Sequence, residues 1–275
     1  MSPFRGSAPF TEEWKHFRFE RDGAVATVTF DRPDKLNALT FDTYADLRDL
    51  LTELPHRGDT RVLVLRGEGR SFCSGGDVDE IIGATLSMRP DELLAFTRMT
   101  GDVVGAMRRC PVPIIAAVHG TAAGAGSVIA LAADFRVVAR SARFAFLFTK
   151  VGLAGADMGA AYLLPRLVGL GRATSMLMLG DTVPAEEADR YGLVSELVDD
   201  DALDAAAAAL AKRLADGPWQ AYAQTKSLLT RELDMGLTGA LELEAMTQAL
   251  LMNGADYREF HAAFTGKRAP QWRGQ

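Results

Sequence analysis

The chain has 275 residues, of which 48% are hydrophobic and 24% are charged, so it can bury a substantial core. Its net charge of -6 and its scattered Lys and Arg residues offer no basic surface for a nucleic-acid backbone. No stretch reaches the roughly 18 apolar residues of a membrane span, and the opening MSPFRGSAPFTEEWKHF lacks an apolar signal core. We therefore expect a globular cytoplasmic protein that binds neither nucleic acid nor membranes.

Cysteine and histidine are scarce in this chain. Cys73 and Cys110 are too few for a disulfide framework, and neither has zinc-ligand spacing to the four histidines. The sequence therefore predicts no disulfide and no metal.

The first half of the chain alternates strand and helix patterns. An Asp-Gly pair at Asp22 and Gly23 separates two runs rich in Val, Thr and Phe, which predicts a hairpin. Periodicity then predicts a helix over 39–54, a buried strand over 61–69 and a helix over 92–107. A second buried strand over 112–120 leads into a helix near Ala125. This alternation is typical of an α/β fold.

Two short strands are predicted over 134–146, and the chain becomes mainly helical after Gly159. Residues 192–198 form the one strand-like run in that part, and helical patterns continue from 202 to 264. We accordingly divide the chain into an N-terminal tail (1–14), an α/β core (15–202) and a C-terminal helical region (203–275).

Two predicted strands end in glycine-bearing loops that run into helices. These loops are RGEGRSFCSGGDVDEI (66–81) and HGTAAGAGSVIAL (119–131). A helix N-terminus has free N–H groups and partial positive charge, so it can hold an anion or a developing oxyanion. Both loops could equally be tight turns, with Asp77 as a helix N-cap. Neither matches a P-loop or the G-x-G-x-x-G dinucleotide pattern.

Seven motifs in order make the chain resemble the enoyl-CoA hydratase/isomerase, or crotonase, superfamily from about Phe17 to Trp272. They are DRPDKLNALT, RSFCSGGDV, PVPIIAAVHGTAAGAG, ADFRVVARSARFAF, VGLAGADMGAAYLLPRLVG, the A-E-E-A-x-x-x-G-L-V run at 185–194, and AFTGKRAP. The resemblance implies a spiral of ββα units with a C-terminal helical region that forms trimers or dimers of trimers. It also implies an acyl-CoA thioester substrate and no separate cofactor.

The family's shared chemistry is stabilisation of a thioester enolate by two backbone N–H groups. The resemblance places these donors at Gly76 and Ala125. It also assigns CoA contacts, some of them expected from a neighbouring subunit: Lys35, Leu36, Ala38, Cys73, Ser74, Gly75, Phe264 and Lys267.

The resemblance fails at the two glutamates with which the family's hydratases position water. The matching residues are Val128 and Phe148, which are apolar and are therefore expected to line the acyl pocket. Asp157, in VGLAGADMG, lies where some isomerases of the family keep a catalytic aspartate. We expect it to shuttle a proton over the enolate, with burial raising its pKa. It could also only cap a helix, and Lys150 could pair with it and lower its pKa.

The sequence therefore favours an isomerase that acts on an acyl-CoA thioester. Two alternatives stay open. One is a hydratase or CoA-ester hydrolase with unusual acid and base residues, and the other is a non-catalytic protein that binds CoA thioesters.

Overall fold

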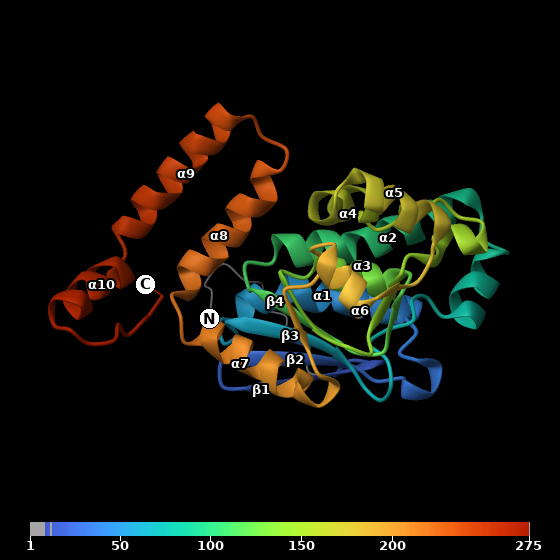
Figure 1. The fold of residues 1–275 in the computed structure, drawn as a ribbon, viewed down its shortest axis with the longest axis horizontal. Helices are drawn as coiled ribbons and strands as arrows, with labels where there is room; N and C mark the ends of the chain where they lie inside the picture. The colour runs from blue at the N-terminus through green and yellow to red at the C-terminus, as the bar shows by residue number, and fades with distance from the viewer. Residues whose placement is uncertain (1–8, 12, 275) are drawn as a thin grey trace.

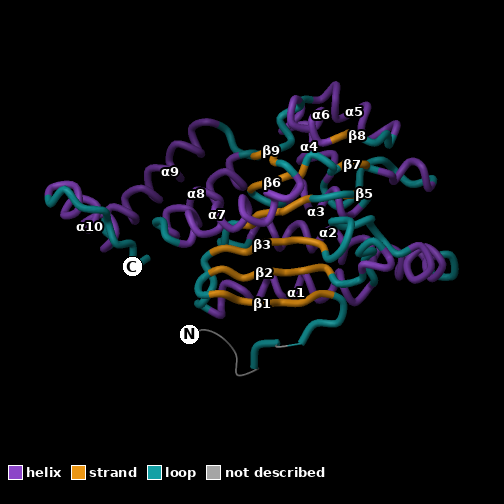
Figure 2. Tube along the Cα trace, turned by 60° about the horizontal axis from the view of Figure 1, so that its bottom comes forward, coloured by secondary structure: helices purple, strands orange, loops and turns teal. Residues whose placement is uncertain are grey.

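The computed structural model describes residues 9–11 and 13–274. Within this range six strands form the main sheet in the order β1-β2-β3-β4-β6-β9, with β1 antiparallel to β2 and the other neighbours parallel. Figure 2 shows β1, β2 and β3 side by side. The bounds are β1 Phe17–Asp22, β2 Val25–Phe30, β3 Val62–Gly67, β4 Ile114–Val118, β6 Phe135–Ala139 and β9 Glu196–Val198.

A smaller sheet has the strand order β5-β7-β8. Its strands are very short: β5 Thr121–Ala123, β7 Arg143–Ala145 and β8 Val183–Pro184. A single turn joins β4 to β5, so the chain passes directly from the main sheet into the smaller one. β5 then leads directly into helix α3.

The helices cover both faces of the main sheet and extend beyond it. Their bounds are α1 Phe41–Arg57, α2 Pro90–Arg109, α3 Ala125–Ala132, α4 Ala160–Val168, α5 Leu170–Leu179, α6 Ala185–Arg190, α7 Leu203–Ala215, α8 Trp219–Glu232, α9 Leu237–Met252 and α10 Ala255–Thr265. Short helical turns occupy Pro33–Lys35, Val78–Gly83, Leu147–Val151 and Asp200–Ala202, and the second of these is a π-helix.

Alternate residues of the central strands enter two separate cores. Leu63 and Leu65 of β3 pack with α1, α2 and α3, whereas Val62 and Val64 pack with α7. Strands buried on both faces read as continuous apolar runs, which is why this part of the sequence predicted strands so clearly.

Helices α8, α9 and α10 form an arm that projects from the body (Figure 1). The boundary expected at residue 203 falls at the start of α7, yet α7 itself packs on the main sheet and the arm begins at α8. The expected tail of residues 1–14 lies partly outside the described residues.

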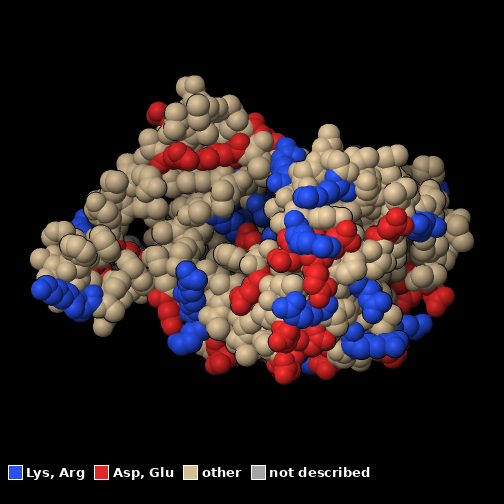
Figure 3. Space-filling view, in the orientation of Figure 1, with Lys and Arg blue, Asp and Glu red and all other residues tan. Residues whose placement is uncertain are grey.

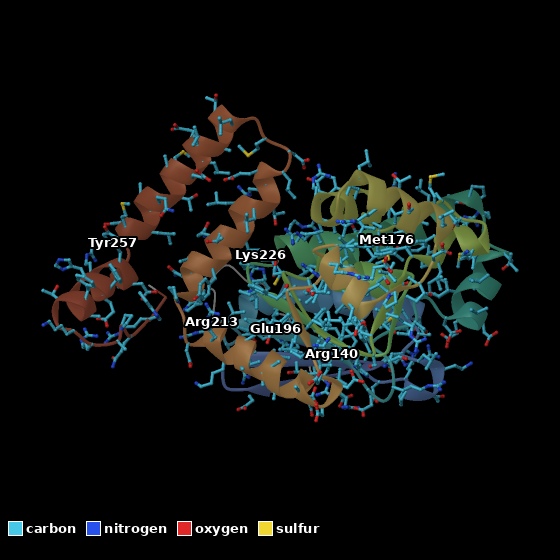
Figure 4. All side chains as sticks on the ribbon, in the orientation of Figure 1. Arg140, Met176, Glu196, Arg213, Lys226 and Tyr257 are labelled. Carbon is cyan, nitrogen blue, oxygen red and sulfur yellow. The ribbon has the colours of Figure 1, made fainter. Side chains whose placement is uncertain are left out.

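A buried ion pair fastens the base of the arm to the body. The Lys226 ammonium donates to the Val112 carbonyl at 2.9 Å and lies 2.7 Å from the Asp134 carboxylate. Asp134 also accepts from the Ile114 N–H at 2.8 Å. Figure 4 shows Lys226 on α8 and Tyr257 toward the far end of the arm.

No helix in the described part of the chain is long and apolar enough to cross a membrane.

Candidate active site

The two glycine-bearing loops lie side by side, joined by backbone hydrogen bonds. The Cys73 N–H donates to the Thr121 carbonyl at 3.0 Å, and the Ala123 N–H donates to the Cys73 carbonyl at 2.9 Å. Segments about 50 residues apart in sequence thus form one short parallel ladder. Gly76 and Ala125 come just after this ladder, one on each of the two segments.

The opposite edge of the first loop pairs with the DRPDKLNAL segment. The Ser74 N–H donates to the Leu36 carbonyl at 3.0 Å, the Leu39 N–H to the Gly75 carbonyl at 2.8 Å, and the Asp77 N–H to the Leu39 carbonyl at 2.9 Å. Residues 73–77 therefore lie between the two other segments. This arrangement brings together the expected CoA contacts Lys35, Leu36, Ala38, Cys73, Ser74 and Gly75.

Backbone approach between the loops requires glycine at two positions. A Cβ atom at Gly126 would lie 2.2 Å from the Cys73 carbonyl oxygen, and one at Gly75 would lie 2.9 Å from the Ala123 oxygen. Gly75 also has φ +100°, a conformation that other residues rarely adopt. These glycines let the segments that carry Gly76 and Ala125 touch.

The N–H groups of Gly76 and Ala125 have no acceptor among residues 9–11 and 13–274. Ala125 is the first residue of α3, where helical geometry leaves N–H groups without an intrahelical partner. At Gly76, both hydrogen bonds toward Leu39 are made by its neighbours Gly75 and Asp77. Two free donors at adjoining turns can together bind an oxygen that gains negative charge.

Asp77 fixes the turn that follows Gly76. Its carboxylate is buried and accepts from the N–H groups of Asp79 and Glu80 at 3.0 Å each, so it is the N-cap of the π-helix as expected. The hydrogen bond from Glu80 is the largest factor that lowers the Asp77 pKa, and the Arg32 guanidinium at 3.0 Å also contributes. Arg32 donates further to the Ala38 carbonyl at 2.8 Å and so ties this turn to the loop of the expected CoA contacts.

Asn37 holds the DRPDKLNAL loop in shape, a role that the sequence analysis missed. Its side-chain amide donates to the carbonyls of Glu68 and Ser71 at 2.9 and 2.7 Å, and its oxygen accepts from the Arg32 N–H at 3.0 Å. Asn37 is buried and has φ +57°. A polar residue between Leu36 and Ala38 is the signal that could have revealed it.

Asp157 does not cap the following helix. Helix α4 begins at Ala160 with Gly159 as its N-cap, and no side chain caps it. The Asp157 carboxylate accepts from the Met158 N–H at 2.8 Å, and burial raises its pKa above the ordinary aspartate value. Lys150 lies 3.5 Å from Asp181, so it does not neutralise Asp157.

Val128 and Phe148 are both buried, in the core that also contains Met158. Val128 has no exposed surface and Phe148 is 8% exposed. Neither position offers a group that can accept a proton. Burial also raises the pKa of the Cys73 thiol to about 12, so Cys73 packs rather than reacts.

Phe264 lies in α10, and Lys267 follows two residues after its end. Figure 1 shows α10 at the far end of the arm, away from α3. Phe264 is 76% exposed. The single chain therefore does not bring these two expected CoA contacts to the two glycine-bearing loops. Among the residues that the structure describes, no group of three His, Cys, Asp or Glu side chains could hold a metal ion.

Tyr44 is a second residue that the sequence analysis missed. It lies on the buried face of α1, and a Cβ atom at Gly76 would lie 3.6 Å from its hydroxyl oxygen. A tyrosine on a helix face made mostly of leucines is the sequence signal for it, but only the fold places it beside Gly76.

Comparisons with known proteins agree on one family. Residues 20–275 match the enoyl-CoA hydratase/isomerase family. A 1,2-epoxyphenylacetyl-CoA isomerase of Escherichia coli K12 is 36% identical over 91% of this chain and 95% of its own length. A probable enoyl-CoA hydratase of Rhodobacter capsulatus is 40% identical over 94% of this chain and 98% of its own length.

The fold is likewise shared with a solved structure. The crystal structure of a putative enoyl-CoA hydratase from Streptomyces coelicolor A3(2) superposes with a TM-score of 0.98 and 69% identity, covering 100% of both chains. Together with the match over residues 20–275, these similarities show that the chain belongs to the enoyl-CoA hydratase/isomerase, or crotonase, superfamily.

Proposed function

We propose that this protein isomerises an acyl-CoA thioester, with Asp157 moving a proton between two carbons of an enolate. The N–H groups of Gly76 and Ala125 hold the thioester oxygen while it carries negative charge. Lys35, Leu36, Ala38 and the segment 73–75 bind the CoA part. Phe148 lines the acyl pocket, whereas Val128, which has no exposed surface, packs within the same core.

The observation that carries this proposal is the state of Asp157. Within the described part of the chain its carboxylate caps no helix and pairs with no lysine. Burial raises its pKa toward the pH at which a carboxylate can both take and return a proton. Val128 and Phe148 stand where the family's hydratases have the two glutamates that act as acid and base in adding water. One carboxylate with no second acid or base suits proton transfer within a substrate.

Isotope incorporation tests this function against hydration and hydrolysis. We would incubate a panel of aliphatic enoyl-CoA and aromatic-derived acyl-CoA thioesters with the enzyme, in D₂O and separately in H₂¹⁸O. Isomerisation should exchange carbon-bound hydrogen and leave the product without ¹⁸O, because no water is added. Incorporation of ¹⁸O would instead support a hydratase or hydrolase, and the names of several relatives favour a hydratase.

A non-catalytic CoA-thioester binder gives a third result in the same assay. It would bind the thioesters and yet exchange no α-hydrogen in D₂O. Exchange at the α-carbon would exclude this alternative, because it requires an enolate and a base.

We further propose that the arm packs against other copies of the chain to form a trimer or a dimer of trimers. Helix α9 contacts α8 and α10, and it exposes apolar side chains that a solitary helix would not keep in water. Leu237 is 75% exposed and Leu250 is 77% exposed. Figure 3 shows uncharged surface over most of this arm, with a band of Asp and Glu across its upper part and Lys or Arg at its far end.

The double variant Leu237→Glu and Leu250→Glu should lower the molar mass in solution from an oligomer to a single chain, because charge is depleted from interface cores. Light scattering after gel filtration measures this. Leu86→Glu, which alters an 84% exposed leucine on the body, should leave the mass unchanged. A wild-type protein of single-chain mass would contradict the proposal.

A further inference from the structure

Tyr44 belongs to a small aromatic cluster between α1 and α2. Its ring packs edge-on against Phe96 with centroids 6.2 Å apart, and Phe96 packs in the same way against Phe41 at 5.0 Å. The Tyr44 side chain is 4% exposed. Its ring position is therefore fixed by packing on both helices.

The Tyr44 hydroxyl points to the first glycine-bearing loop (66–81), which contains Gly76. A Cβ atom at Gly76 would lie 3.6 Å from the hydroxyl oxygen and 3.7 Å from a side-chain carbon of Ile81. Burial raises the pKa of Tyr44, and the negative charge of Asp157 adds to this effect. The Tyr44 hydroxyl therefore lies next to Gly76 and Ile81.

The hydroxyl has no hydrogen-bond partner within residues 9–11 and 13–274. Two more exposed tyrosines do have one, since Tyr162 donates to Asp234 at 2.7 Å and Tyr191 donates to Glu187. The hydroxyl oxygen is not one of the fully buried unpaired side-chain atoms, so it keeps accessible surface although the residue as a whole is only 4% exposed. An unpaired donor beside a candidate oxyanion site can be satisfied by a bound substrate.

We propose that the Tyr44 hydroxyl donates a hydrogen bond to an oxygen on the acyl part of the substrate, an inference that rests on the function proposed above. In the proposed function, the Gly76 and Ala125 N–H groups already bind the thioester oxygen. The Tyr44 hydroxyl lies near Gly76 on the side to which a Cβ atom would point, toward Ile81. The acceptor is therefore a second oxygen, and the substrate class is an acyl-CoA with a hydroxyl, ether or carbonyl oxygen near the thioester.

The variant Tyr44→Phe tests this inference, because it removes the hydroxyl and keeps the ring that packs on Phe96. The probes are butyryl-CoA, 2-hydroxybutyryl-CoA and acetoacetyl-CoA. None has a carbon–carbon double bond to hydrate or shift, and each of the last two has one more oxygen than butyryl-CoA. The wild type should bind at least one oxygenated probe about tenfold more tightly than butyryl-CoA, as a single hydrogen bond allows. Tyr44→Phe should abolish that preference without changing the affinity for butyryl-CoA.

Isothermal titration calorimetry gives these affinities, and Tyr222→Phe is the matched control because it removes a phenol hydroxyl from a cavity between α7 and α8. An equal loss of affinity for all three probes, or no loss for any, would overturn the inference. If the wild type binds none of the three thioesters, the proposed function fails. If it binds them without a preference that depends on Tyr44, only the present inference fails.

Discussion

Asp157→Asn is expected to lower kcat by about 10²- to 10⁴-fold, the usual contribution of a general acid or base. Asparagine keeps an oxygen that can accept from the Met158 N–H, as the carboxylate does at 2.8 Å. The substitution therefore removes the proton-transfer group and preserves the turn. The rate of α-hydrogen exchange in D₂O measures the effect on any thioester that the wild type turns over.

The folded protein should tolerate this change. Burial raises the Asp157 pKa, so the folded state binds the proton more tightly than the unfolded state does. The contribution of Asp157 to stability is then present below the unfolded pKa and is lost as pH rises through the folded pKa. Asp157→Asn should be at least as stable as the wild type at pH 8 in urea unfolding.

The pH dependence of kcat/KM provides an independent check. The wild-type rate should fall on the acid side at a pH above the ordinary aspartate pKa, and that limb should vanish in Asp157→Asn. Asp181→Asn makes the same chemical change at an exposed site beside Lys150 and should leave the rate unaltered. Full turnover by Asp157→Asn would show that another group moves the proton.

Gly126→Ala should also lower kcat strongly, by about 10²- to 10³-fold, because it separates the two N–H donors of the oxyanion site. The added Cβ would lie 2.2 Å from the Cys73 oxygen and 2.8 Å from the Cys73 Cβ. Both obstacles belong to the ladder between the two loops, so the ladder itself must move. The free energy of unfolding should fall by about 1 to 3 kcal/mol, as for other overpacked cores.

Gly101→Ala is the matched control. Gly101 lies inside α2, and nothing lies within 4 Å of a Cβ atom placed there. The change should raise helix stability by about 0.5 to 1 kcal/mol and leave kcat unchanged. Urea unfolding and the exchange assay, applied to both variants, separate a general loss of stability from damage to the oxyanion site. Gly126→Ala with wild-type kcat would show that the donor positions do not depend on this contact.

Much of the fold follows from local patterns. The hairpin at Asp22 and Gly23 was predicted correctly, as were α1, β3, α2 and β4, with their ends displaced by a few residues. Their apolar periods are long and their turn residues are distinctive. Strands β5 and β8 were not predicted, because two or three residues carry no measurable period.

For the site, the sequence identified the two glycine loops and the apolar residues Val128 and Phe148. It also singled out Asp157, whose surroundings it could not settle: α4 begins two residues later than a cap at Asp157 would require, and Lys150 turns toward Asp181. Side-chain pairing of this kind depends on where loops 147–159 and 180–183 meet, which short-range patterns do not encode.

By itself the sequence determined the order of strands and helices, the family and the residues available for chemistry, since these depend on residue types at short spacings. The tertiary structure decided which backbone N–H groups stay unpaired, because the ladder among segments 36–39, 73–77 and 121–125 uses their neighbours. It also placed the Tyr44 hydroxyl beside Gly76, and it placed Phe264 far from the glycine-bearing loops of the same chain. Each of these facts arises from contacts between segments that lie tens of residues apart.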